Sequence, residues 1–243
     1  MKILEIKHLL KRFDGVAAVD HLSAEIEAGK ITALIGPNGS GKSTLINTLT
    51  GIFPLDGGGV VIRGAHLFSI ESPEIAAYGI TRTFQEVRLW NQMTVFENLL
   101  VALTERSIIG SMFEHHNELH QKQAQELLEK VRLCEKKGEL VGGLSYGQRK
   151  LLEIARALAM NAEIYFFDEP FAGLFPEMTK IVVSILEELR AKGKTVLLVE
   201  HNMNLIRQLA DHVIVLDAGK LLAQGKPNEV LERRDVIEAY LGE

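Results

Sequence analysis

A glycine-rich segment near the N-terminus constrains this chain more than any other feature of its sequence. Residues Gly36–Thr44 read Gly-Pro-Asn-Gly-Ser-Gly-Lys-Ser-Thr and match the pattern G-x-x-x-x-G-K-[ST]. The apolar run Ile31–Ile35, typical of a buried strand, comes immediately before, and Ser43–Leu49 reads as a helix that ends at Gly51. A glycine turn that merely opens a helix needs no such strand, whereas phosphate binding by this pattern does. The segment therefore predicts a nucleotide-binding α/β domain.

Each residue type in this segment has a chemical reason to be there. The glycines let successive backbone N–H groups point towards the α- and β-phosphates, and the helix that begins here adds the positive end of its dipole. Lys42 can reach the β- and γ-phosphates, and Ser43 can offer its hydroxyl to Mg²⁺. We take the whole segment as the candidate nucleotide-binding loop: Gly36, Pro37, Asn38, Gly39, Ser40, Gly41, Lys42, Ser43 and Thr44.

Two adjacent acids follow a later apolar run. Ile164–Phe167 reads as a strand, and Asp168 and Glu169 come directly after it. Because successive side chains of a strand point in opposite directions, the two acids cannot do the same task. Asp168 can hold Mg²⁺ beside the phosphate loop, directly or through water, which leaves Glu169 to polarise an attacking water as general base. Alone, such a pair would be a strand end meeting solvent; together with the loop it predicts a nucleoside triphosphatase.

The rest of the pattern predicts an α/β fold with an inserted helical portion. Strands at Thr195–Val199 and Val213–Leu216 alternate with helices at Glu177–Arg190 and Met203–Leu209, which implies parallel βαβ units. The N-terminal part reads as β-rich, and a helix is expected to start with Ser72 as N-cap and Pro73 at its first position. The expected N-terminal strands and turn are Ile3–Ile6, Leu22–Ile26, a glycine turn at Leu55–Gly59, and Val60–Arg63.

The middle of the chain reads as helical. Thr94 and Glu97 form a capping box before Leu99–Leu103, and Glu114–Arg132 has the polar composition of an exposed helix. Tyr146-Gly147 is expected to interrupt the chain before the amphipathic helix Gln148–Met160. His116 and His120 have the i, i+4 spacing of a ligand pair on the expected helix, but no third ligand at matching spacing is evident. We therefore interpret them, together with His115, as a solvated face rather than a metal site.

Composition and charge exclude several classes of protein. The chain has 243 residues, with 27 Lys and Arg against 32 Asp and Glu and a formal net charge of −5, which argues against a mainly electrostatic nucleic-acid binder. A single cysteine, Cys134, excludes an internal disulfide and fits a reducing compartment. No signal peptide is evident, and the apolar runs are far shorter than the ~18 residues that span a bilayer. We expect a soluble, cytoplasmic protein whose membrane role, if any, is peripheral.

Four further motifs resemble those of the ATP-binding-cassette (ABC) ATPases. In order, they resemble the Q-loop glutamine (Gln85), the signature motif (Leu144–Gln148), the D-loop (Ala172–Pro176) and the switch histidine (His201). With the phosphate loop and the two acids, they follow the order of that family over essentially the whole chain. The resemblance implies one nucleotide-binding domain with an α/β P-loop NTPase fold. A parallel-sheet core with an N-terminal antiparallel β subdomain is expected at 1–86 and 162–243, and an inserted α-helical subdomain at 87–161.

The resemblance also implies ligands and residue roles. ATP and Mg²⁺ are the expected cofactors, with Ser43, Gln85 and Asp168 as the metal ligands. Phe13 matches the aromatic that stacks on adenine, and the alternative is ordinary packing within its strand. The implied catalytic set consists of the general base, the γ-phosphate contact, the loop lysine and the Q-loop glutamine: Glu169, His201, Lys42 and Gln85.

In this family, the signature of one subunit closes over ATP held by a second subunit. Ser145, Gly147 and Gln148 are therefore implied to bind the nucleotide of a partner in a head-to-tail dimer. The D-loop of this chain departs from the family pattern, because Phe175 stands where Asp or Asn usually helps to link the two ATP sites. Whether this chain retains that coupling, and whether its partner is a copy or a paralogue, is open.

Longer segments resemble the ATPases of branched-chain (hydrophobic) amino acid importers, among them Gly79–Gln85, Leu152–Leu158 and Val236–Gly242. That resemblance implies transmembrane permease subunits as partners, an extracytoplasmic solute-binding protein as an indirect one, no nucleic acid, and a peripheral location at the cytoplasmic face of the inner membrane. Leu89 and Trp90 are candidate contacts to the permease, unless Trp90 is an ordinary core aromatic.

Several alternatives stay open beside amino acid import. ATPases of urea or amide importers and of a lipopolysaccharide exporter are close relatives of this branch. A soluble ABC ATPase of DNA repair or translation would need long coiled coils or a second cassette, and a P-loop kinase has no use for the motif Leu144–Gln148.

Overall fold

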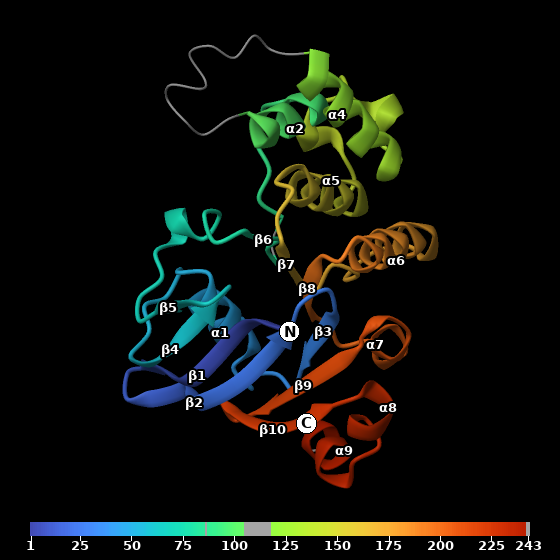
Figure 1. Cartoon of the computed structure of the whole chain (residues 1–243). Helices are drawn as coiled ribbons and strands as arrows, with labels where there is room; N and C mark the ends of the chain where they lie inside the picture. The colour runs from blue at the N-terminus through green and yellow to red at the C-terminus, as the bar shows by residue number, and fades with distance from the viewer. Residues whose placement is uncertain (86, 105–117, 242–243) are drawn as a thin grey trace. The chain divides into compact units, whose positions relative to one another are not determined.

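The computed structural model describes residues 1–85, 87–104 and 118–241 (Figure 1). Its strands are β1 (Lys2–Phe13), β2 (Val16–Glu27), β3 (Ile31–Ile35), β4 (Gly57–Ile62), β5 (Ala65–Leu67), β6 (Ile80–Arg82), β7 (Ile164–Asp168), β8 (Thr195–Val199), β9 (His212–Asp217) and β10 (Lys220–Gly225). Its α-helices are α1 (Lys42–Leu49), α2 (Val95–Leu103), α4 (Glu118–Lys130), α5 (Tyr146–Ala159), α6 (Pro176–Ala191), α7 (Met203–Leu209), α8 (Pro227–Val230) and α9 (Arg234–Leu241). Single 3₁₀ turns occupy Ser72–Glu74, Cys134–Lys136 and Val141–Gly143. Of the helices in these ranges, none is both long and apolar enough to cross a membrane.

The chain divides into two compact units. The core unit comprises Met1–Arg82, Glu163–Glu169 and Ile185–Glu243, and it contains both β-sheets. The helical unit comprises Thr83–Ala162 and Pro170–Ser184, and within it α2, α4 and α5 pack against one another.

A six-stranded sheet in the order β10-β9-β3-β8-β7-β6 carries the motifs of the core unit. All of its strands are parallel except β10, which pairs antiparallel with β9. The expected strands Ile31–Ile35 and Thr195–Val199 have the observed bounds, because every position of β3 and β8 is buried and a continuous apolar run signals such a strand. Val199 pairs with Leu34 of β3 and with Asp168 of β7. The carboxyl ends of β3, β7 and β8 therefore meet at one edge of the sheet.

The two faces of this sheet are covered by different apolar clusters. In β3, Ala33 and Ile35 belong to one cluster and Leu34 to the other, as the alternation of side chains along a strand requires. The first cluster includes residues of α7, α8 and α9, and the second includes residues of α1 and of the four-stranded sheet. Fully buried side chains such as Phe166 stabilise the fold by about 1.5–3 kcal/mol each. The strand ends that carry the motifs are thus held by packing on both faces.

The four-stranded antiparallel sheet, in the order β2-β1-β4-β5, corrects one expectation. We expected Leu55–Gly59 to be a turn, but β4 already begins at Gly57. Gly57 pairs with Leu10 of β1. Gly58 has φ of 77°, and a Cβ atom there would lie 2.2 Å from the carbonyl oxygen of His8. The glycines allow a bulge within the strand rather than ending it.

Two predicted helix starts are also wrong in detail. Ser72 does not cap a helix through its side chain; Ser72–Glu74 is a 3₁₀ turn whose N-cap is Glu71. Tyr146 and Gly147 do not interrupt the chain, because α5 begins at Tyr146 with Ser145 as its N-cap. A Cβ atom on Gly147 would lie 2.6 Å from Sδ of Met178, so the absence of a side chain leaves room for that methionine.

Other helical predictions of the helical unit are confirmed. The capping box of Thr94 and Glu97 is present at the start of α2. Glu118–Lys130 forms α4, within the expected exposed helix, of which residues 114–117, with His115 and His116, lie outside the described residues.

Candidate functional site

The predicted phosphate-binding loop connects β3 to α1 in the core unit. Three of its glycines have positive φ angles, 149° at Gly36, 75° at Gly39 and 99° at Gly41. A Cβ atom on Gly36 would lie 2.1 Å from the carbonyl oxygen of Leu216, and one on Gly41 would lie 2.3 Å from that of Ala18. Glycine is therefore required at positions 36 and 41, both by the backbone conformation and by the close approach of the Leu216 and Ala18 backbone.

The ammonium group of Lys42 is held against this loop. Its Nζ donates hydrogen bonds to the carbonyl oxygens of Gly36 (2.7 Å) and Pro37 (2.8 Å) and to Oγ of Ser40 (3.4 Å). Lys42 is only 6% exposed, and a lysine is almost never so buried unless its ammonium group has partners. A positive charge is thus already in position at the loop.

The start of α1 completes an arrangement that fits an anion. Its N-cap is Gly41, which makes no side-chain cap hydrogen bond to the first turn of the helix. The first N–H groups of a helix need acceptors, and the helix dipole favours a negative one. Asn38, Gly39 and Ser43 are exposed on the loop and Thr44 is half-buried. Glycine-lined backbone, a held ammonium group and an uncapped helix start together suit a phosphate group.

Asp168, at the end of β7, is buried and paired with Arg82 at the end of β6. Arg82 donates to Oδ2 of Asp168 over 2.9 Å, to Asn47 over 2.6 Å and to Thr50 over 3.1 Å. Side-chain exposure is 9% for Arg82 and 3% for Asp168. This pairing connects Asp168, the candidate metal ligand, to α1 through Arg82, which was not among the predicted site residues. The sequence does hint at a role for Arg82, because it is a single positively charged residue shortly after Gly79 and Ile80, at the end of a strand.

The described residues contain no group of three or more His, Cys, Asp or Glu side chains arranged to hold a metal ion. Mg²⁺ commonly takes only one or two protein carboxylates and completes its shell with water and phosphate oxygens. The hydroxyl of Ser43 and the carboxylate of Asp168 are oxygen donors of the kind that fits this mode. Gln85, the third candidate ligand, belongs to the helical unit.

Glu169 directly follows β7 and has an unusual backbone conformation. Its φ is 49°, a left-handed value that is rare for a residue with a side chain. Its N–H donates to the carbonyl oxygen of Val199 over 3.0 Å, and its Oε1 lies 3.1 Å from Nε2 of His201. The strained backbone therefore turns the carboxylate of Glu169 towards the residue that follows β8.

Glu200 is a buried acid beside this pair and was not among the predicted site residues. Its Oε1 accepts hydrogen bonds from the N–H groups of His201 and Asn202, each over 3.0 Å. Burial raises the pKa of Glu200, and the neighbouring charge of Glu169 raises it further. The carboxyl group fixes the backbone that carries His201. The sequence does hint at a role for Glu200, because it is a charged residue that directly follows the apolar run Thr195–Val199.

Phe13, the candidate for adenine stacking, lies at the end of β1. Its ring makes an edge-to-face contact with Phe53, with centroids 5.1 Å apart, and Nζ of Lys11 lies 5.1 Å from its centroid. Phe13 is 40% exposed, so part of the ring is accessible to a planar ligand. The ring thus combines a packing contact within the core unit with an accessible surface.

The signature residues lie at the N-terminus of α5 in the helical unit. Oγ of Ser145 accepts from the N–H of Gln148 over 3.3 Å, and the side chain of Gln148 accepts from the N–H of Ser145 over 2.9 Å. A Cβ atom on Gly173 would lie 2.9 Å from the Tyr146 ring, so the D-loop backbone packs closely on the signature. The side chain of Phe175 is 73% exposed.

Gln85 is exposed, and its neighbours in the chain are fixed to α5 by Glu153. Oε1 of Glu153 accepts from the N–H groups of Phe84 (3.3 Å) and Arg88 (3.4 Å). Glu153 is 5% exposed, and burial raises its pKa. Its position on the buried face of an amphipathic helix was the only signal that this acid is not a surface residue.

Trp90 is fixed by its backbone rather than by burial of its ring. Its N–H donates to Oδ1 of Asn98 (3.1 Å), and its carbonyl oxygen accepts from Nδ2 of the same residue (3.0 Å). The ring is 42% exposed and stacks with the guanidinium of Arg156, 4.1 Å from the ring centroid. Trp90 is therefore not an ordinary core aromatic.

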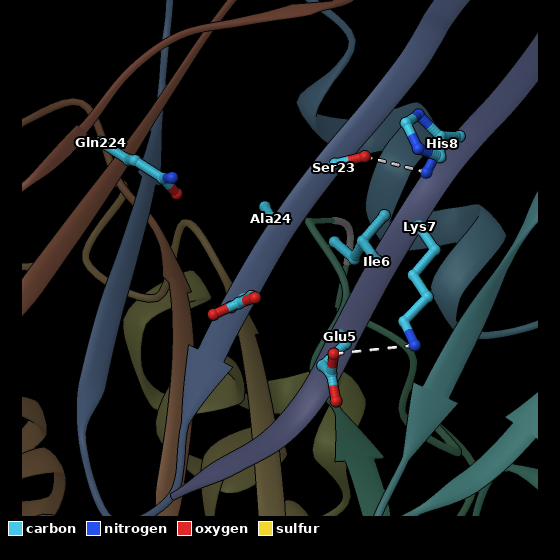
Figure 2. Close-up of a pocket in the computed structure, with 8 residues that line it drawn as sticks. Glu5, Ile6, Lys7, His8, Ser23, Ala24 and Gln224 are labelled. Carbon is cyan, nitrogen blue, oxygen red and sulfur yellow. Dashed lines mark hydrogen bonds and ion pairs between the residues drawn. The ribbon is translucent and has the colours of Figure 1, made fainter.

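A pocket of about 340 Å³ lies over β1 and β2, with Gln224 of β10 at its edge (Figure 2). Figure 2 shows the N–H of His8 donating to Oγ of Ser23 and the ion pair of Glu5 and Lys7 on its lining. The residues that line this pocket do not include any predicted site residue.

The structure thus distributes the predicted residues over both units. The loop, Asp168, Glu169, His201 and Phe13 belong to the core unit, and the strand ends bring Glu169 and His201 into contact. Gln85, Ser145, Gly147 and Gln148 belong to the helical unit.

Comparisons with known proteins extend over the same segments. Residues 19–172 match a family described as ABC transporter, and residues 220–243 match one described as branched-chain amino acid ATP-binding cassette transporter. The high-affinity branched-chain amino acid transport ATP-binding protein LivG of Salmonella typhimurium is 40% identical over 250 residues, which cover 99% of this chain and 98% of LivG.

Two solved structures resemble the whole fold. One is a nucleotide-free ATP-binding cassette from an ABC transporter, with a TM-score of 0.88 and 36% identity. The other is an ATP-binding cassette of an ABC transporter in its ADP conformation, with a TM-score of 0.87 and 37% identity. Both comparisons cover 100% of each chain, so the likeness includes the core unit and the helical unit alike.

Proposed function

Because the chain belongs to the ABC transporter family, in the branch of the branched-chain amino acid transport ATP-binding proteins, we propose that it binds and hydrolyses ATP. In this proposal, hydrolysis drives the uptake of branched-chain or other hydrophobic amino acids by a membrane transporter. The likeness to the two solved cassettes confirms the predicted ABC ATPase fold. The observation that carries the proposal is the joint presence, at one sheet edge, of the phosphate loop with its held lysine and the contact between Glu169 and His201.

The phosphate loop binds the triphosphate in this proposal. Backbone N–H groups of the loop and of the first turn of α1 donate to the phosphate oxygens, and Lys42 exchanges its carbonyl acceptors at Gly36 and Pro37 for the β- and γ-phosphates. Phe13 stacks on the adenine ring. Ser43, Gln85 and Asp168 would hold Mg²⁺, which would neutralise phosphate charge there.

Glu169 and His201 carry out the hydrolytic step. Glu169 accepts a proton from the attacking water, which forms a bond to the γ-phosphorus as the bond to the β–γ bridging oxygen breaks. Nε2 of His201 exchanges its contact with Glu169 for a hydrogen bond that it donates to the γ-phosphoryl oxygens, where negative charge is redistributed in the transition state. Gln85 orients the water from the segment that Glu153 fixes to α5.

A second ATPase subunit completes each site. Ser145, Gly147 and Gln148 form a helix N-terminus, which suits the γ-phosphate of a nucleotide held by a partner's loop. Contacts to a charged phosphate stabilise by about 1.5–3 kcal/mol each, so a triphosphate closes the dimer and a diphosphate releases it. The partner is a copy of this chain or a paralogue. The exposed ring of Phe175 replaces the polar D-loop residue at that interface.

Transmembrane permease subunits are the other direct partners. The half-exposed ring of Trp90, beside Leu89, is the proposed contact, at the cytoplasmic face of the membrane. An extracytoplasmic solute-binding protein would act indirectly, and no nucleic acid is involved.

Substitution of Lys42 tests nucleotide binding. Lys42→Ala should weaken ATP binding at least about tenfold and abolish hydrolysis, because a charge-assisted contact to phosphate is lost. Lys30→Ala, which removes an exposed lysine paired with Glu27, is the matched control and should leave both unchanged. Equal ATP affinity in the Lys42→Ala variant and the natural protein would refute the assignment of the loop.

The transported solute requires the assembled transporter. Reconstituted with its permease subunits and binding protein, the chain should support ATP-dependent leucine uptake. Uptake of urea or an amide, or export of lipopolysaccharide, with no leucine uptake would instead select one of the related transporters. ATPase activity without any membrane partner would favour a soluble role.

A further inference from the structure

The first glycine of the phosphate loop is contacted by a side chain from the opposite end of the chain. The hydroxyl of Tyr240 accepts a hydrogen bond from the backbone N–H of Gly36 over 2.7 Å. Tyr240 lies on α9, the last helix of the chain, which packs beside β10 in the core unit (Figure 1). It falls in the C-terminal segment 220–243, whose family match is separate from the match that covers the loop.

Gly36 needs such a partner because of where the sheet ends. The register of β3 with β8 and β9 runs from Ile31 to Ile35, so Gly36 lies one residue beyond the ladder. Gly36 is buried, and a buried backbone N–H without an acceptor is strongly unfavourable. Its φ of 149° and its contact with Leu216 leave little freedom to turn elsewhere. The tyrosine hydroxyl therefore supplies an acceptor that the sheet does not.

The tyrosine is itself held in place. Val236 and Tyr240 are four residues apart on α9 and share one face of that helix. Val236 is buried in the cluster that contains Ile35, and the partly buried ring of Tyr240 packs against the same cluster. The ring thus packs against the cluster that includes the last residue of β3, while its hydroxyl reaches the first residue of the loop.

The same glycine links Tyr240 to the loop lysine. The N–H of Gly36 donates to Tyr240, and its carbonyl oxygen accepts from Nζ of Lys42 over 2.7 Å. We propose that Tyr240 is a positioning residue for the phosphate loop: its hydroxyl holds the Gly36 backbone so that the loop presents its N–H groups and Lys42 to the nucleotide phosphates. This inference rests on the proposed function of the loop, and it gives the C-terminal helix a part in ATP binding without contact to ATP.

Tyr240→Phe tests the inference because it removes only the hydroxyl. Without the hydroxyl, the loop should spend less time in the conformation that binds nucleotide, so Kd for ATP and for ADP should rise roughly three- to tenfold. The KM for ATP should rise by a similar factor while kcat at saturating ATP stays within about twofold, because the hydroxyl does not touch the reacting atoms. Tyr78→Phe is the matched control: Tyr78 is also half-buried against the core unit's apolar cluster, and its hydroxyl bonds to no described residue.

Amide hydrogen exchange provides a readout independent of activity. In the natural protein the Gly36 amide should be protected although it lies beyond the sheet ladder, and Tyr240→Phe should lose that protection while Ile35 keeps it. An unprotected Gly36 amide in the natural protein overturns the inference without any variant. So does an unchanged Kd in Tyr240→Phe, or an equal rise in Kd for Tyr78→Phe. Failure of the natural protein to bind ATP would instead refute the proposed function itself.

Discussion

Nε2 of His201 lies 3.1 Å from Oε1 of Glu169. A carboxylate only accepts hydrogen bonds, so Nε2 carries the hydrogen in this contact. The contact joins the ends of two neighbouring parallel strands, because Val199 of β8 pairs with Asp168 of β7 and also accepts the N–H of Glu169. The position of the proposed base is thus set by sheet register and by one imidazole.

Glu169→Gln should separate ATP binding from turnover. The amide oxygen can still accept from His201, so the local structure is kept, but the side chain cannot take a proton from water. Steady-state hydrolysis should fall by roughly a hundredfold or more, in line with the loss of a general base, while Kd for ATP stays near the natural value. Light scattering on a sizing column should show an ATP-stabilised dimer. Normal steady-state activity would refute this choice of base.

His201→Ala should impair the same step by a different route. Glu169 loses the hydrogen bond that holds its carboxylate, and the transition state loses a donor, which typically lowers turnover by about 10²–10³-fold. Single-turnover hydrolysis, measured alongside ATP affinity, checks this expectation. His66→Ala, at an exposed position of β5, controls for loss of a histidine and should be unchanged. A His201→Ala variant with the natural rate would contradict the proposed contact to the γ-phosphate.

Arg82→Ala should cause a large loss of stability. It removes a buried ion pair and leaves Asp168, 3% exposed, without its guanidinium partner. Breaking such a pair from one side typically lowers the free energy of unfolding by about 3–5 kcal/mol. Lys2→Ala removes a comparable but exposed pair with Glu25 and should change stability by less than about 1 kcal/mol. Urea denaturation of both variants measures the difference in the free energy of unfolding. Similar losses of stability in the two variants would show that the pair of Arg82 and Asp168 contributes no more than an exposed ion pair.

The amino-acid pattern predicts the buried strands and the phosphate loop well, for physical reasons. A strand covered on both faces needs an uninterrupted apolar run, so Ile31–Ile35 and Thr195–Val199 could be bounded without a structure. The loop glycines are equally readable, because sterics leave no alternative residue at Gly36 or Gly41.

Contacts between distant segments could not be predicted in this way. Gly57 looks like turn material, and only its pairing with Leu10 shows that it belongs to β4. Glu153 and Glu200 look like surface acids until the backbone N–H groups they accept from are known. The partner of Tyr240 is 204 residues away in the sequence, and no local pattern encodes that distance.

Glu153→Gln should reveal the cost of a buried carboxylate through its pH dependence. Burial raises the pKa of Glu153 above its ordinary 4.5, although the Phe84 and Arg88 amides and the charges of Lys150 and Arg156 oppose the rise. A raised pKa means that ionisation destabilises the folded state above the folded pKa, and that this penalty disappears below pH 4.5. Glutamine stays neutral and keeps an oxygen acceptor, so it carries no such penalty.

Urea unfolding at a series of pH values measures this effect. The free energy of unfolding of Glu153→Gln, relative to the natural protein, should be highest at neutral and alkaline pH and should decline as pH falls towards 4.5. Glu126→Gln, at an exposed position of α4, controls for the loss of one carboxylate. An advantage of Glu153→Gln that instead grows on acidification would show that the charged form is favoured by its surroundings.

Trp90→Ala should separate the proposed membrane role of this chain from its proposed ATPase activity. Two hydrogen bonds with the Asn98 side chain hold the Trp90 backbone, so truncating a ring that is 42% exposed should leave the fold and soluble ATP hydrolysis intact. Loss of the ring should nevertheless abolish ATP-dependent uptake in the reconstituted transporter, because large half-exposed aromatics dominate binding at interfaces. Asn98→Ala is the structural counterpart: Asn98 is fully buried, and its loss should lower stability and activity together. If Trp90→Ala unfolds the protein, or if transport continues at the natural rate, the ring is not the contact to the permease.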